Sequence, residues 1–153
     1  MLTSEGTTAQ LLAILKETIE GPGEHGSFFI DKNTGLLQTL ETLDLERAFA
    51  NAAPGRPSIA AHVQHTSFHM HAISAWPRGD HSQRDWPASF ALPGHDAATW
   101  AVLLEELKFE YQDFQSVIQE SASDSDEALG GAIGGIVHVA YHLGAIRQLI
   151  HLV

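Results

Sequence analysis

The chain has 153 residues, with 8 Lys and Arg, 19 Asp and Glu, ten His and no Cys. This length predicts a single domain over residues 1–153, large enough to form a hydrophobic core without cross-links. The lack of Cys excludes disulfides, thiolate-ligated metal centres and a cysteine nucleophile. The formal net charge of −11 argues against a nucleic-acid partner, which needs a basic face. The unusual feature is the number of histidines.

The sequence leads us to expect neither a targeting segment nor a membrane-spanning segment. Its first ten residues, MLTSEGTTAQ, lack the basic and apolar regions of a signal peptide. The most apolar stretch, residues 128–153, is interrupted by five Gly, three His and one Arg, whereas a membrane span needs about 18 or more apolar residues. We therefore expect a cytoplasmic protein without a membrane partner.

Apolar residues recur at helical intervals of three and four along most of the chain. The elements expected in the first third are a helix capped by Thr7 or Thr8 and running to about Glu20, a loop over residues 22–34, a short helix over residues 36–43 and a turn from Asp44 through Ala50. Three longer helices are expected after these, from Ser58 as N-cap to about Ala75, from Asp96 to Glu120, and from Asp126 to Leu149.

No segment alternates in the manner of a strand, so the sequence predicts an all-α protein. Four long helices are typical of a four-helix bundle. Residues 76–94, which contain three Pro and two Gly, predict an elaborated loop between the second and third of these helices. Loops of this length are often functional.

Four glycines lie in the first half of the last predicted helix: Gly130, Gly131, Gly134 and Gly135. Each costs a helix about 1 kcal/mol relative to Ala. Either a neighbouring backbone approaches closely here, within the bundle or across a dimer, or the start of the helix is frayed. The sequence leaves both alternatives open.

Histidines gather on two of the predicted helices. His62, His65 and His69 share one helix face, and His138 and His142 are spaced so that both imidazoles can converge on one ion. A single buried His is commonly satisfied by an ordinary hydrogen bond. Two His-rich faces together favour a metal site, because neutral imidazole binds zinc, nickel, copper and iron.

Two common metal motifs are absent. Val139 follows His138 where zinc proteases carry a Glu base, and no Glu is followed three residues later by His, as di-iron bundles require. The remaining histidines are expected on the surface or, for His71, on another side of the helix: His25, His71, His81, His95 and His151.

Two motifs resemble those of the DinB/YfiT-like metal-binding four-helix bundles. Residues 134–148, GGIVHVAYHLGAIRQ, are similar to the C-terminal signature of that family. Residues 58–65, SIAAHVQH, resemble its helix-two motif, in which the metal-binding His stands seven residues after a Ser. Residues 35–40, GLLQTL, and 85–90, DWPASF, are also similar to segments of such proteins. The resemblance covers nearly the whole chain in helix order.

The resemblance implies a mononuclear divalent-metal site formed by His65, His138 and His142. Three protein ligands leave positions open for water or substrate. Zinc or nickel is the expected metal, with iron, manganese or copper as alternatives. His62 could replace His65 as ligand, or His62 and His69 could orient the ligands or act as acid–base groups; the spacing of the family motif favours His65.

Members of this family with known activities are similar to transferases and isomerases that use low-molecular-weight thiols. The resemblance therefore implies a small-molecule substrate and a metal ion that lowers the pKa of a thiol nucleophile. Arg147 is a candidate for binding the cosubstrate, and Arg78 and Arg84 are further local cations. The alternatives are a non-catalytic metal-binding or stress-related protein and a hydrolase that activates a metal-bound water.

The loop over residues 76–94 carries aromatic and acidic side chains. Trp76, Trp86 and Phe90 are interpreted as anchors of this loop on the bundle rather than as groups that stack on substrate. Asp80 and Asp85 could accept hydrogen bonds from ligand imidazoles. Because ligand imidazoles must be neutral, metal affinity is expected to fall as the pH drops through about 6.5.

Overall fold

The regular structure in the described part of the chain is helical. The computed structural model describes residues 3–24 and 26–153, and within these it contains no strand. Its α-helices are α1 Ser4–Glu20, α2 Leu36–Leu40, α3 Leu45–Phe49, α4 Ile59–Ala75, α5 Ala97–Ser121 and α6 Asp126–Leu149. The prediction of an all-α protein is confirmed.

Short polar side chains cap the helix N-termini because they satisfy backbone N–H groups that have no partner within the helix. The predicted caps Asp44 and Ser58 are confirmed, since Asp44 accepts from the Arg47 N–H at 2.9 Å and Ser58 from the Ala61 N–H at 3.2 Å. The predicted start of the first helix was wrong. Thr3 accepts from the Gly6 N–H at 3.1 Å and caps α1, so Thr7 and Thr8 lie inside that helix.

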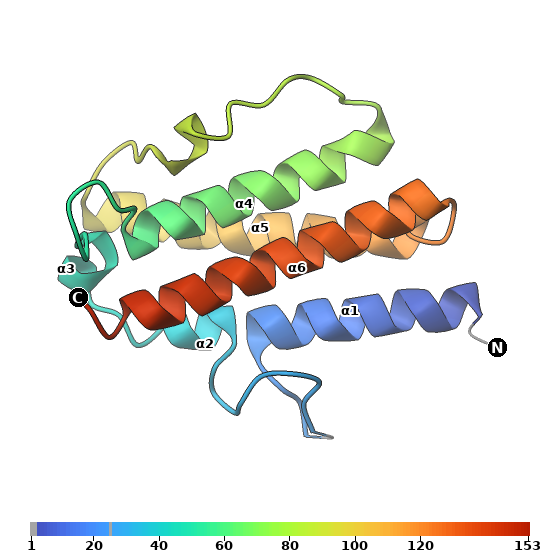
Figure 1. Ribbon diagram of the computed structural model, residues 1–153, viewed down its shortest axis with the longest axis horizontal. Coiled ribbons are helices and arrows are strands. Elements are labelled where there is room, and N and C mark those ends of the chain that lie inside the picture. The colour runs from blue at the N-terminus through green and yellow to red at the C-terminus, as the bar shows by residue number, and fades with distance from the viewer. Residues whose placement is uncertain (1–2, 25) are drawn as a thin grey trace.

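The four long helices pack around one hydrophobic core. α4 contacts α5 and α6, and α1 contacts the same two helices. Figure 1 shows α4 above α1, with α6 in front and α5 behind. Fully buried side chains come from each long helix, including Leu15, Val63, Phe114 and Val139. This arrangement places α4 beside α6, the two helices that carry the clustered histidines.

The segment between α4 and α5 contains two short 3₁₀ helices, η1 Trp76–Arg78 and η2 Ala88–Phe90. The segment runs alongside α4 in Figure 1, and η2 packs directly on that helix. The long loop predicted over residues 76–94 is therefore only partly irregular, and its second half covers one side of α4.

A buried carboxylate holds the loop that follows α1. Glu17 is 4% exposed, and its oxygens accept from the N–H groups of Phe28, Phe29 and Ile30 at 2.6, 2.8 and 3.1 Å. Burial alone raises the pKa of Glu17, but the three backbone donors outweigh burial and lower it. The carboxylate therefore stays ionised and ties residues 28–30 to α1.

The α6 glycines have different surroundings. α6 is regular from Asp126, so the alternative of a frayed start was wrong. A Cβ on Gly135 would lie 2.5 Å from Cζ of Phe114, so the close neighbour at this position is a buried ring and not the backbone that the other alternative expected. A Cβ on Gly130, Gly131 or Gly134 would meet nothing within 4 Å among the described residues.

Among the described residues, α6 is also the one helix long and apolar enough to cross a membrane, with a mean hydropathy of 1.4 over its best window. Only the length and composition of α6 suggest a membrane span, and the core helices of soluble proteins have the same properties. Insertion would also carry His138 and His142 into the bilayer, where polar side chains are costly.

Candidate metal centre

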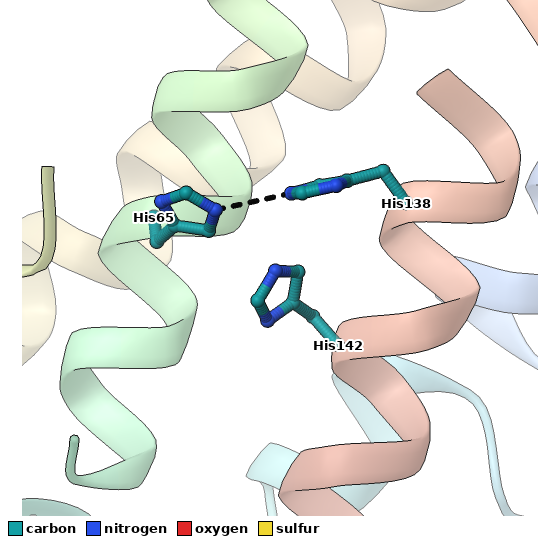
Figure 2. A group of neighbouring side chains, drawn as sticks. All are labelled: His65, His138 and His142. Atoms are coloured by element: carbon teal, nitrogen blue, oxygen red, sulfur yellow. Dashed lines mark hydrogen bonds between the residues drawn. The ribbon is translucent and has the colours of Figure 1, made fainter. Parts of the chain in front are cut away.

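Three histidines from α4 and α6 converge in the space between these helices. One nitrogen from each of His65, His138 and His142 lies within 4.8 Å of the other two. Figure 2 shows His65 reaching across from α4 to His138, with the His142 ring directly below them. His65 and His142 are buried and His138 is half-buried. The group could hold a metal ion.

The loop after α4 fixes the protonation of the His65 ring. Nδ1 of His65 lies 2.6 Å from Oγ of Ser89, and the Ser89 hydroxyl donates its own hydrogen to the Trp86 carbonyl. The hydroxyl therefore accepts a hydrogen bond from Nδ1–H of His65. In the neutral ring this leaves the lone pair on Nε2, the nitrogen that faces His138.

His142 has a comparable partner on α4. Its Nδ1 lies 2.9 Å from Nδ1 of His62. Since Nδ1 is engaged there, Nε2 of His142 is the nitrogen left for an ion, and Figure 2 shows one ring nitrogen of His142 directed toward the other two rings. His62 thus contacts a member of the three-histidine group but is not part of it.

The spacing of the facing nitrogens suits a shared ion. Nε2 of His65 and Nε2 of His138 are 3.1 Å apart. Two nitrogens bound to one tetrahedral zinc are about 3.3 Å apart, since each Zn–N bond is about 2.0–2.1 Å long. Because Nε2 of His65 carries the lone pair, His138 donates this hydrogen bond, and an ion would have to displace that proton. The third nitrogen, from His142, lies within 4.8 Å of both.

A fifth histidine stacks on the group. The rings of His69 and His138 are nearly parallel, with centroids 3.6 Å apart and an interplanar angle of 11°. Nδ1 of His69 is buried and lacks a hydrogen-bond partner in residues 3–24 and 26–153. Buried polar atoms without partners are rare and indicate a place where water or a ligand binds.

Aromatic side chains from the loop cover the histidines. The ring of Phe90 stacks on the ring of His65 with centroids 4.0 Å apart. The ring centroid of Trp86 lies 5.5 Å from the centroids of both His69 and Phe68. Trp86 and Phe90 therefore anchor the loop on α4 directly over the site. Trp76 lies elsewhere, stacked on His81.

Burial keeps the clustered imidazoles neutral. Burial, followed by repulsion from neighbouring imidazoles, lowers the pKa of His65 to about 4 and the pKa values of His69 and His142 to about 3. Burial also lowers the pKa values of His62 and His138. Neutral imidazole is the form that binds metal. Protons should therefore compete for His65 near about pH 4, well below the value of about 6.5 expected from ordinary histidine.

Neither predicted carboxylate bonds to an imidazole within the described part of the chain. Asp80 accepts from Ser82 and Arg84, and Asp85 accepts from the Ala88 N–H at 3.0 Å. Sequence reasoning missed Ser89, which performs the expected role. Its only signal was its place in the segment DWPASF, residues 85–90, between the two aromatic anchors.

Each of the three predicted cations contacts a residue outside the histidine cluster. Arg147 donates to Oγ1 of Thr39 on α2 at 3.2 Å, and its role in cosubstrate binding stays a prediction. Arg78 and Arg84 pair with Asp113 and Asp80, each at 2.7 Å.

The other histidines lie away from this group. His71 is exposed and contacts Glu110 on α5, as expected from its place on another side of the helix. His81, His95 and His151 are also exposed. His25 lies outside the described residues.

No family model, curated protein or solved structure matches the chain. Membership of the DinB/YfiT-like family accordingly stays a proposal, and the functional argument rests on the three-histidine group.

Proposed function

We propose that this chain is a four-helix bundle of the DinB/YfiT type, with an elaborated loop, that binds one divalent metal ion through His65, His138 and His142. Zinc or nickel is the first choice, and iron, manganese or copper would also accept imidazole ligands. The observation that carries the proposal is the pair of supporting contacts, Ser89 to His65 and His62 to His142, which leave Nε2 of both rings for the ion.

The proposed reaction is transfer of a low-molecular-weight thiol to an electrophilic small molecule. The thiolate sulfur forms a bond to carbon, and the leaving group departs with the electron pair of the bond that breaks. When bound, the ion would lower the pKa of the thiol and so supply a thiolate nucleophile. The chain contributes neutral ligands, and the rings of Phe90 and Trp86 shield one side of the group from water. Three protein ligands leave room for the thiol.

His62 and His69 act as positioning residues in this proposal. His62 orients His142 through the 2.9 Å contact, and His69 stacks on His138. An effective acid–base group has a pKa near the operating pH, whereas burial lowers the pKa of His69 to about 3. A hydrolase that activates a metal-bound water is a weaker alternative for the same reason. It needs a general base beside the site, and the lowered pKa of His69 makes that residue a poor base.

Elemental analysis of untagged protein tests the ligand set. We expect wild type and His71→Ala to retain metal, because His71 is exposed and contacts Glu110. His65→Ala and His142→Ala should lose it. Full metal content in either ligand variant would contradict the assignment.

A conjugation assay tests the reaction. Metal-loaded protein is mixed with monochlorobimane and a panel of low-molecular-weight thiols, with His142→Ala and metal-free protein as matched controls. We expect turnover that both controls lack. Absence of turnover with every thiol would refute the transferase and leave the metal site standing.

A non-catalytic metal-binding protein is the second candidate. This candidate is favoured because the three ligands come from two helices, α4 and α6, which pack together. An ion bound by them would cross-link these helices. In that case metal would raise stability without supporting any turnover.

The proposal places the protein in the cytoplasm, with a small-molecule substrate and neither nucleic acid nor membrane as partner. The net charge of −11 supports the exclusion of nucleic acid. A homodimer is also proposed, through the exposed face of α6 that carries Ile133, Val137 and Tyr141. Light scattering of wild type and Val137→Glu tests it, with loss of a dimer expected in the variant.

A further inference from the structure

A separate cavity of about 590 Å³ opens between the end of α4 with η1, the end of α5 and the first turns of α6. Its walls are mainly apolar, with Ile73, Phe114, Ile118 and Ala132 among them, and none of the five clustered histidines lines it. Ile73 stands one helical turn after His69, about 6 Å along the axis. The volume is in the range of sites for small molecules.

One side of the cavity is aromatic. The rings of Trp76 and His81 stack with centroids 4.2 Å apart and an interplanar angle of 26°. The Trp76 carbonyl accepts from Nε2–H of His81 at 3.0 Å, which holds the imidazole against the indole. Such a pair presents a flat surface on which a second ring can stack.

The charge of the cavity is negative. Trp76 Nε1–H donates to Oε1 of Glu127 at 3.3 Å, which holds the carboxylate beside the indole. Among the described residues that line the cavity, Glu127 carries the one formal charge, and no Lys or Arg is present. A ligand that brings a cation is therefore favoured over an anion, through the carboxylate.

Gly131 keeps one wall open. It lines the cavity, and a Cβ at this position would meet nothing within 4 Å among the described residues. A helical Gly costs about 1 kcal/mol relative to Ala, and no packing contact on α6 requires it here. The absence of a side chain leaves space at this wall of the cavity that a ligand can fill.

We propose that this cavity binds a small aromatic amine, with its ring against the apolar wall and Trp76 and its ammonium group at Glu127. The inference does not rest on the metal site, because the two share no residue.

Calorimetric titration of the full-length protein tests the proposal with 2-phenylethylamine, which is an ammonium ion at neutral pH, and 3-phenylpropionate, an anion of similar shape. We expect the amine to bind about tenfold or more tightly than the anion, and to shift the indole N–H resonance of Trp76. His142→Ala should bind the amine as wild type does. Equal affinity for the two compounds, or no binding of the amine, would overturn the proposal.

Two matched pairs of variants locate the binding. Gly131→Leu should abolish amine binding by filling the cavity, whereas Gly130→Leu, on the neighbouring helical Gly that does not line it, should not. Glu127→Gln should reduce the preference for the cation, whereas Glu120→Gln, at an exposed position outside the cavity, should preserve it. Equal effects within either pair would place the amine elsewhere and refute the site.

Discussion

Ser89 Oγ lies 2.6 Å from Nδ1 of His65, and the same hydroxyl donates its hydrogen to the Trp86 carbonyl. A residue of the loop after α4 thereby decides which nitrogen of a helix histidine carries the proton. Since Nδ1 is protonated, Nε2 faces His138 as a lone pair. The loop therefore prepares the ring for an ion.

Ser89→Ala is expected to weaken metal binding about 10- to 100-fold, because the His65 ring loses the contact that fixes its tautomer and orientation. Competition with a chromophoric chelator measures the affinity. Ser82→Ala is the control, since Ser82 is exposed and bonds to Asp80 and not to a histidine. Unchanged affinity in Ser89→Ala would show that the hydroxyl does not support the site.

The sequence was sufficient for features that depend on local spacing. The caps Ser58 and Asp44 and the bounds of α6 follow from short-range patterns, and the i, i+4 spacing of His138 and His142 already indicates a shared face. The contacts of Ser89 and His62 could not be predicted, because each joins segments far apart in the chain, 24 and 80 residues respectively. Both contacts depend on how the loop and α6 pack against α4.

Metal removal is expected to lower the melting temperature without unfolding the protein. The core contains apolar side chains from all four long helices and does not include the ligands. Free metal at about 100 times its Kd should stabilise the fold by about 2.7 kcal/mol. Thermal melts with and without chelator measure the shift, and His142→Ala should show none. Loss of helical circular dichroism on chelation would instead indicate a structural ion.

Acid is expected to destabilise the metal-free protein between about pH 6.5 and 4. Burial, then neighbouring imidazoles, lowers the pKa of His65 to about 4 in the fold, whereas the unfolded chain keeps the ordinary value of about 6.5. The unfolded state binds more protons in this window, so the free energy of unfolding falls as the pH falls.

Chemical denaturation at several pH values within this window measures the effect. His142→Gln, which removes one titrating group with a lowered pKa, should show a smaller dependence on pH. A stability that stays constant from about pH 6.5 to 5 would contradict the shifts. The contribution of Glu17 is separable, because its lowered pKa affects stability only below about pH 4.3.

Two glycines one position apart on α6 should respond in opposite directions to the same substitution. A Cβ on Gly135 would lie 2.5 Å from Cζ of Phe114, a fully buried ring, whereas a Cβ on Gly134 would meet no atom of residues 3–24 or 26–153 within 4 Å. Gly135→Ala should therefore destabilise the protein by about 1–3 kcal/mol through overpacking. Gly134→Ala should stabilise it by up to about 1 kcal/mol, because Ala is the better helix former. Urea unfolding measures the stability of both variants. A stabilised Gly135→Ala would contradict the prediction, because it would mean that the Phe114 ring moves aside at little cost. α6 would then not be held against α5 at this position.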